Sequence, residues 1–211
     1  MAPPLITITR QFASGGSDIA QLVATQLGWT VIDNEFVDEV ARRAGLPATE
    51  VAQREERAPS LLERLARTLA VSSPEMFVTT AGVPRLDDDE ATIVKIAERI
   101  ITEAAQHGRV VLVGRGAQAL LAQRPDALHV YVVASKAWRR QVAVDRLGAD
   151  PASVEKLVDE TDRQRDGYVK THYGRARQAP ENYDLVVNAE RLGFTGAADL
   201  VVAEAKRRGW A

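Results

Sequence analysis

Short apolar runs alternate with amphipathic stretches along most of this chain. Runs rich in β-branched residues predict short strands at residues 5–9, 29–33, 109–113, 128–134 and 183–188. Apolar residues at helical spacing predict helices between them, at residues 19–27, 34–44, 88–106, 117–122, 136–147, 151–168 and 197–208. This alternation predicts a single α/β domain over residues 1–211, with an open, mostly parallel five-stranded sheet and helices on both faces.

Two segments depart from this rhythm. Pro47, Pro59, Pro74 and Pro84 divide residues 45–86 into short helical pieces without a strong strand, which predicts a helical insertion that moves relative to the sheet. Residues 139–177 are rich in arginine and lysine and predict a basic lid. Within it, Arg163 and Lys170 lie two helical turns apart and share one face. Cations on a hinged lid suit phosphoryl transfer, which needs positive charge and exclusion of water.

The loop after the first strand is a candidate phosphate site. It contains Ser14, Gly15, Gly16, Ser17 and Asp18 at the start of a helix. Glycines let the backbone approach an anion, and N–H groups that open a helix then point toward it. We therefore expect the N–H groups of residues 14–18 to hold a phosphate. The alternative is a turn that only joins strand to helix.

This loop lacks the lysine of a standard phosphate loop, Gly-x-x-x-x-Gly-Lys-Ser/Thr. If Gly15 is the second motif glycine, Gly16 stands at the lysine position and Ser17 keeps the metal-binding hydroxyl. Arg10 replaces the opening glycine, and its guanidinium, always charged, is predicted to supply the missing cation. In the alternative, Arg10 pairs with a carboxylate such as Asp33 and touches no ligand.

A second candidate site follows the buried strand at residues 109–113. Arg115 stands there between Gly114 and Gly116, at the end of the sheet where α/β proteins bind ligands. Most arginines in proteins cover apolar surface with their stems, but an arginine flanked by glycines at this point favours binding of a phosphate or substrate.

Composition narrows the classes of function. The chain is 45% apolar and 27% charged, and it has no cysteine, which excludes disulfides, thiolate zinc sites and thiol catalysis. A net charge of -2 and the lack of a recognition motif argue against nucleic acid as a partner. No run reaches the ~18 apolar residues of a membrane span, and residues 1–4 do not resemble a signal peptide. We expect a cytoplasmic protein without membrane association, and a homo-oligomer stays open.

Together these residues resemble the cytidylate kinase-like family of P-loop nucleoside monophosphate kinases. The family's opening, Ile-Ser-Arg-Gln-aromatic-Gly-Ser-Gly-Gly, is similar to residues 6–16, although Ala13 replaces a glycine. Residues 111–116 and 183–188 resemble its second signature and last strand. We expect Ala13 to be tolerated only at negative φ, because a Cβ resists the left-handed conformation.

The resemblance implies ATP and Mg²⁺ as donor and metal, with CMP or dCMP as the acceptor. It implies that Asp33, Asn34 and Arg115 bind substrate, and that Arg163 and Lys170 act beside Arg10 in catalysis. Ser17 and Asp33 would bind Mg²⁺. Authentic cytidylate kinases have the lysine that is absent here, and an arginine where this chain has Glu39. Two alternatives therefore stay open: a nucleotide-binding regulator that does not catalyse, and a kinase of another small molecule.

Overall fold

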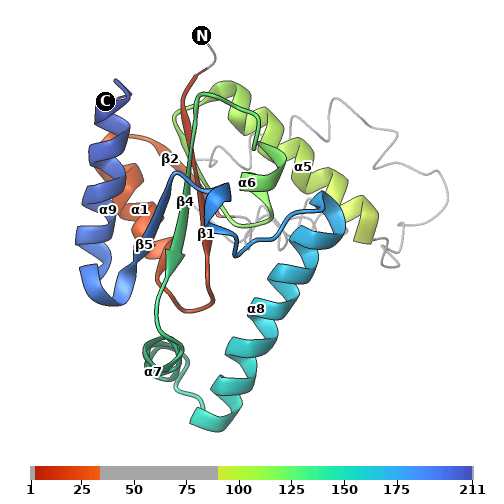
Figure 1. Cartoon of the computed structure of the whole chain (residues 1–211), viewed down its shortest axis with the longest axis vertical. Helices are drawn as coiled ribbons and strands as arrows, with labels where there is room; N and C mark the ends of the chain where they lie inside the picture. Colours follow the sequence, from red (N-terminus) through yellow and green to blue (C-terminus); the bar gives the residue numbers. More distant parts are fainter. Residues whose placement is uncertain (1–2, 34–89, 211) are drawn as a thin grey trace, which may run out of the picture.

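The centre of the molecule is a parallel sheet. The computed structural model describes residues 3–33 and 90–210. Within them, five strands pair in parallel in the order β2-β3-β1-β4-β5 (Figure 1). The strands are β1 (Leu5–Arg10), β2 (Thr30–Asp33), β3 (Val110–Val113), β4 (Ala127–Val133) and β5 (Leu185–Asn188). The prediction of an open α/β sheet is confirmed.

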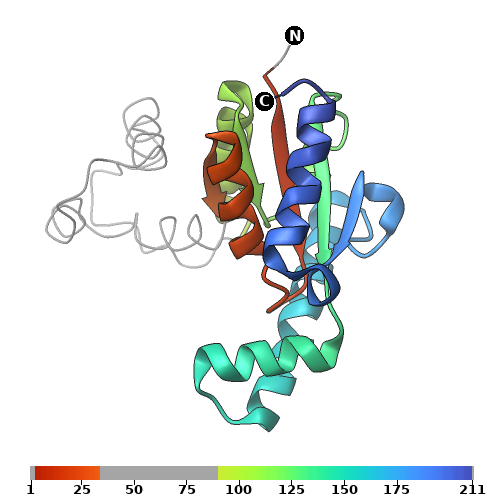
Figure 2. The same ribbon diagram turned by 90° about the vertical axis from the view of Figure 1, so that its left-hand side faces the viewer.

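Helices cover both faces of this sheet (Figure 2). Helices α1 (Gly16–Leu27) and α9 (Ala189–Arg207) bury one face around Ile6, Ile8 and Val23. Helices α5 (Glu90–His107) and α6 (Ala117–Leu120) bury the other face around Leu5 and Leu112. Successive strand residues point to opposite faces, so strands covered on both faces read as continuous apolar runs.

Two helices extend beyond the carboxyl ends of the strands (Figure 1). Helix α7 (Lys136–Leu147) follows β4, and α8 (Pro151–Tyr173) packs against it around Ala143, Val154 and Val158. Gly148 ends α7 in a left-handed conformation, and the Asp150 carboxylate accepts the Ser153 N–H at 2.9 Å to begin α8. A short 3₁₀ turn, Pro180–Asn182, then leads into β5. These helices lie beside the sheet end where ligands bind in this class of fold.

Helices α8 and α9 are longer than the sequence pattern predicts. Helix α8 continues from residue 168 to Tyr173, and α9 begins at Ala189 instead of residue 197. Gly193 has non-helical angles (φ 68°, ψ 168°) and kinks α9, which interrupts its apolar periodicity. The predicted helix at residues 34–44 and the predicted insertion at residues 45–86 lie outside the described residues. In the described part of the chain, no helix is long and apolar enough to cross a membrane.

Candidate functional site

The loop between β1 and α1 presents N–H groups at the carboxyl end of the sheet. Gly15 caps α1 with φ 79°, and a Cβ at this position would collide with the Phe194 ring. The Ile19 N–H donates to the Gly15 carbonyl at 3.0 Å. Gly16, Ser17 and Asp18 precede it in the first turn, where N–H groups have no acceptor within their own helix. Their N–H groups therefore form a site that suits an anion.

Ser14 does not belong to this set of donors. It is fully buried, and its N–H donates to the Gln11 carbonyl at 3.3 Å. Its hydroxyl donates to the carbonyls of Gln11 at 2.9 Å and Val132 at 3.3 Å. These donors shape the loop, so the geometry does not favour the predicted role of Ser14 in binding phosphate, which stays a prediction.

Ala13 adopts the conformation that we expected it to avoid. Its φ is 58°, in the left-handed region. The expectation of a negative φ was wrong because the turn itself requires a left-handed residue at this point. An alanine there bears a steric cost of about 1–2 kcal/mol that glycine would not have. Contacts elsewhere must hold the loop in this shape.

The side chain of Arg10 runs beneath the loop. It is 7% exposed, and its Cβ and Cδ lie 2.6 and 2.8 Å from where a Cβ on Gly16 would stand. Its Nη2 pairs with Asp33 Oδ1 at 3.2 Å, and its Nη1 lies against Gly114. The contact with Asp33 that the sequence raised as an alternative is therefore present. Gly16 lacks a side chain at the lysine position, and the stem of Arg10 fills that space.

Ser17 and Asp33, the predicted metal ligands, lie together. The Ser17 hydroxyl donates to Asp33 Oδ2 at 2.7 Å. Hydroxyl and carboxylate oxygens are ligands that Mg²⁺ accepts, usually together with water and substrate phosphates. Among the described residues no group of three or more His, Cys, Asp or Glu side chains could hold a metal ion. This donor set therefore fits an ion that arrives with a nucleotide. Asn34 lies outside the described residues.

Two cavities meet at the end of the sheet. The smaller, about 200 Å³, is lined by residues 10–18 together with side chains of α7 and Arg165. The larger, about 630 Å³, is lined by Arg10, Arg115, Arg165, Arg177, Tyr168 and Tyr183, among others. Arg10 and Arg165 line both cavities. Two cations therefore border both cavities.

Arg115 lines the larger cavity, at the sheet end where the sequence analysis placed it. Its guanidinium stands 5.1 Å from the centre of the Tyr168 ring, and its φ is 48° between Gly114 and Gly116. A Cβ on Gly116 would collide with the Tyr173 ring, so glycine is needed where the turn approaches α8. Burial raises the pKa of Tyr183 to about 12, so the phenol that lines the cavity is neutral near pH 7.

Arg163 and Lys170 do not line either cavity. Both are exposed, whereas Arg165, Tyr168 and His172 of the same helix face the larger cavity. Arg165 lies in helical register with the buried residues Val158 and Val169, so it faces the body of the molecule. This register was a signal in the sequence that pointed to Arg165. Arg177 follows the helix, where no periodicity indicates its burial.

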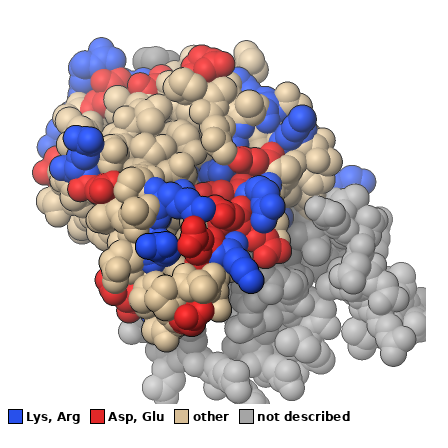
Figure 3. Space-filling view, turned by 60° about the horizontal axis from the view of Figure 1, so that its bottom comes forward, with Lys and Arg blue, Asp and Glu red and all other residues tan. Residues whose placement is uncertain are grey.

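Basic side chains in and beside the predicted basic lid form ion pairs with acidic side chains. Acidic and basic side chains lie side by side on this end of the molecule (Figure 3). Lys136 pairs with Asp159 at 2.8 Å, and Arg140 pairs with Glu155 at 3.2 Å. Arg146 pairs with Asp18 at 3.0 Å, which connects α7 to the first turn of α1. Much of the positive charge of this region is therefore balanced locally.

Comparisons with known proteins find similar sequences and similar folds. The cytidylate kinase of Streptococcus thermophilus (strain CNRZ 1066) is 24% identical over 224 residues, covering 96% of each chain. An uncharacterized protein from Eubacterium ventriosum ATCC 27560 has a similar structure, with a TM-score of 0.68 and 17% identity over 96% of this chain and 98% of that chain. Shikimate kinase from Acinetobacter baumannii, in complex with shikimate, has a TM-score of 0.53 and 13% identity, over 98% and 94% of the two chains.

The match to a protein family covers most of the chain. The sequence pattern of the cytidylate kinase-like family matches residues 5–191. The matched part includes the loop after β1 together with Asp33, Arg115, Arg165 and Arg177. These solved structures share the fold of this chain. The chain therefore belongs to the cytidylate kinase-like family.

Proposed function

We propose that this protein is a cytoplasmic, ATP-dependent kinase that phosphorylates a nucleoside monophosphate, CMP or dCMP. The observation that supports the proposal most directly is the pair of adjacent cavities that share Arg10 and Arg165. One cavity has the N–H donors of a helix start, and the other is lined by four arginines. Phosphoryl transfer depends on positioning and on positive charge near the transferred group, and this arrangement supplies both.

The smaller cavity suits the donor. The first-turn N–H groups of α1 would hold phosphate oxygens, and Ser17 and Asp33 would hold Mg²⁺ with its water ligands. Bound ATP supplies the phosphoryl group, and Mg²⁺ supplies part of the charge neutralisation. Arg10 and Arg165 place fixed positive charge where the two cavities meet. Arg10 thereby takes the part of the missing lysine.

The larger cavity suits an anionic acceptor. Arg115 and Arg177 add two guanidinium groups to those of Arg10 and Arg165. A guanidinium group can donate two parallel hydrogen bonds to two oxygens of one phosphate. This lining therefore favours a phosphate monoester over a neutral sugar. Tyr168 and Tyr183 provide aromatic surface in the same cavity. The choice of cytosine rests on the family and on the cytidylate kinase relative. Direct roles for Arg163 and Lys170 stay predictions, which this geometry does not favour.

One observation favours a second candidate function. Arg10 is paired with Asp33, which is also bonded to Ser17, so the predicted lysine substitute and the predicted metal ligands share one carboxylate. A protein that keeps this pair and binds a nucleotide without catalysis would act as a regulator. A kinase of another small molecule is a third candidate, because the fold is shared with shikimate kinases.

A coupled assay that measures ADP release separates these candidates. The purified protein is given MgATP with CMP, dCMP, UMP, AMP, shikimate or gluconate in turn, and MgATP binding is measured by calorimetry. Turnover with CMP or dCMP above all other acceptors is the expected result. Turnover only with another acceptor would move the chain to a different kinase class, and MgATP binding without any turnover would favour the regulator.

A further inference from the structure

The main chain of the loop after β1 is held by side chains that come from residues 139–177. Phe12 contributes both of its main-chain polar groups to these contacts. Its N–H donates to Asp162 Oδ1 at 2.9 Å, and its carbonyl accepts from Arg139 Nη1 at 3.0 Å. The Arg10 carbonyl accepts from Arg177 Nη1 at 2.8 Å and from Arg165 Nη1 at 3.4 Å. The loop is therefore fixed from outside at its first and third residues.

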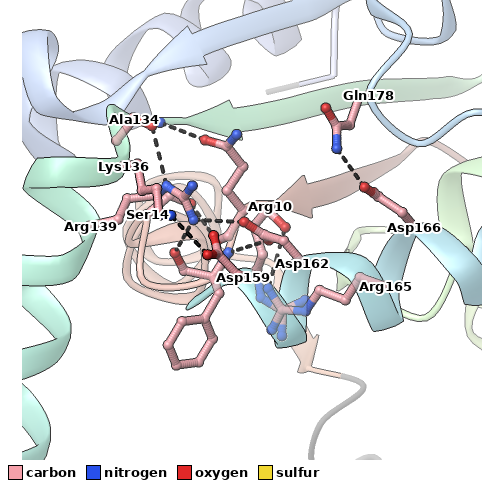
Figure 4. Close-up of polar contacts among 12 residues, drawn as sticks. Arg10, Ser14, Ala134, Lys136, Arg139, Asp159, Asp162, Arg165, Asp166 and Gln178 are labelled. Carbon is pink, nitrogen blue, oxygen red and sulfur yellow. Dashed lines mark hydrogen bonds and ion pairs between the residues drawn. The ribbon is translucent and has the colours of Figure 1, made fainter. Parts of the chain in front are cut away.

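Asp162 is at the centre of these contacts (Figure 4). Besides the Phe12 N–H, its carboxylate accepts from Arg139 Nη1 at 2.7 Å and lies 3.5 Å from Arg177 Nη2. The two arginine side chains are 6% and 4% exposed, and the Asp162 side chain is 16% exposed. A buried cation that loses its counter-charge is strongly unfavourable. Asp162 is the counter-charge of Arg139, and it shares Arg177 with Asp166, whose Oδ1 lies 2.5 Å from Arg177 Nε.

Asp162 itself touches no cavity. It is absent from the lining of both cavities, whereas its partner Arg177 lines the larger one and Phe12 the smaller one. The loop also contains Ala13 at positive φ and has Arg10 in place of the motif's opening glycine. Such strained backbone persists only where surrounding contacts determine it. We infer that Asp162 is a positioning residue, which holds the loop in the shape that exposes its N–H groups to phosphate.

The inference rests on the proposed use of this loop for ATP, but it can be tested without ligand. In Asp162→Asn the shape of the side chain is kept and its charge is lost. Hydrogen exchange of the ligand-free protein, followed amide by amide, should show faster exchange at Phe12 and Ser14, whose N–H groups donate to Asp162 and to the Gln11 carbonyl. We expect a change of roughly tenfold or more, as for loss of a hydrogen bond to a charged group. Amides of β4 should exchange as in the unmodified protein.

A matched control lies one turn earlier on the same helix. Asp159→Asn removes an exposed ion pair with Lys136 and leaves the loop contacts intact, so it should not change loop exchange. Equal loop exchange in the unmodified protein, Asp159→Asn and Asp162→Asn would overturn the inference. If Asp162→Asn does not fold, Arg139→Lys tests the same group of contacts. The guanidinium of Arg139 donates to Phe12, Ala134 and Asp162 at once. A lysine keeps the charge, but its single ammonium group cannot reach all three acceptors. Unchanged loop exchange in Arg139→Lys would also overturn it.

Binding of MgATP distinguishes this inference from the proposed function. If both hold, Asp162→Asn raises the dissociation constant for MgATP about tenfold or more, and Asp159→Asn does not. If the unmodified protein does not bind MgATP, the proposed function fails while the exchange result still decides the role of Asp162. If MgATP binds equally well to Asp162→Asn in spite of faster loop exchange, Asp162 stabilises the loop without positioning it for the nucleotide, and the inference is wrong.

Discussion

At the scale of single residues, the main departure from a standard phosphate loop concerns two positions that lie next to each other in space, residues 10 and 16. Where the standard motif has glycine and then lysine, this chain has Arg10 and then Gly16. The stem of Arg10 lies where a side chain at position 16 would begin. The two positions are therefore coupled by volume, and each substitution is expected to depend on the other.

This coupling gives the first prediction. Arg10→Gly should lower turnover by about 10²-fold, as loss of a transition-state cation does. Gly16→Lys alone should destabilise the protein, because its Cβ meets the stem of Arg10. Together the two substitutions recreate the standard motif over residues 10–17 and should recover part of the turnover in the coupled assay. Normal turnover in a folded Arg10→Gly variant would show that Arg10 is structural.

Ala13 gives the second prediction. Ala13→Gly should raise the free energy of unfolding by about 0.5–1 kcal/mol, because relief of the left-handed alanine exceeds the extra flexibility of glycine in the unfolded chain. Urea denaturation measures it. Ala203→Gly, at an exposed position inside α9, is the matched control and should lower stability by about 1 kcal/mol. A decrease in both variants would contradict the left-handed strain.

The sequence predicted the place of a residue in the fold correctly where the local pattern of strand, loop and helix determines that place. Gly15, Ser17 and Arg115 lie where the strand–loop–helix pattern placed them, because helix starts and strand ends are local features. The φ of Ala13 was predicted wrongly, and the sequence did not show that Ser14 bonds to the carbonyls of Gln11 and Val132 across the turn. The partner of Arg10 was left open by the sequence, and the three-dimensional structure pairs it with Asp33.

At the scale of elements, helix α8 decides which cations reach the site. Its cavity-facing positions include Arg165, Tyr168 and His172, and its exposed positions include Arg163 and Lys170. The sequence correctly indicated a helix with arginines, but the sequence analysis did not single out the face that packs against α7 and the loop after β1. The buried valines of α8 settle that face, because Val154, Val158 and Val169 repeat at the spacing that also contains Arg165.

The third prediction compares two arginines on this helix. Arg165→Ala should lower kcat about 10²-fold or more, because it removes a cation at the junction of the cavities. Arg163→Ala, two residues earlier and exposed, should leave kcat within about twofold, as expected for a surface charge. Both follow from steady-state kinetics with ATP and the preferred acceptor. A large loss in Arg163→Ala with little loss in Arg165→Ala would support the original choice of cations.

At the scale of the whole molecule, stability should depend on pH through His129. This residue lies in the central sheet, is 8% exposed, and has Nδ1 2.7 Å from the Thr7 hydroxyl. Burial lowers its pKa, and the charges of Arg175 and Arg208 act in the same direction, whereas Asp184 opposes them. The unfolded chain therefore binds a proton more readily, so stability is full above the ordinary histidine pKa and falls as the pH drops below it.

The fourth prediction follows from that sign. Between about pH 7.5 and about pH 5.5, above the ordinary pKa range of carboxyl groups, the free energy of unfolding should decrease with acidification. In His129→Asn, which keeps a polar group near Thr7, this decrease should be smaller even if overall stability is lower. Urea denaturation at several pH values measures the slope. The same slope in both proteins would place the pH dependence elsewhere.

The contacts that shape the loop after β1 also have a consequence for the order of synthesis. Residues 10–18 leave the ribosome early, but their partners come much later in the chain and are Arg139, Asp162, Arg177 and Phe194. A nascent chain that ends before Asp162 already contains the complete Ser-Gly-Gly-Ser sequence. Of the four partner side chains it contains only Arg139. Contacts so distant in sequence form late. The loop after β1 should therefore reach its final shape only when translation is nearly finished.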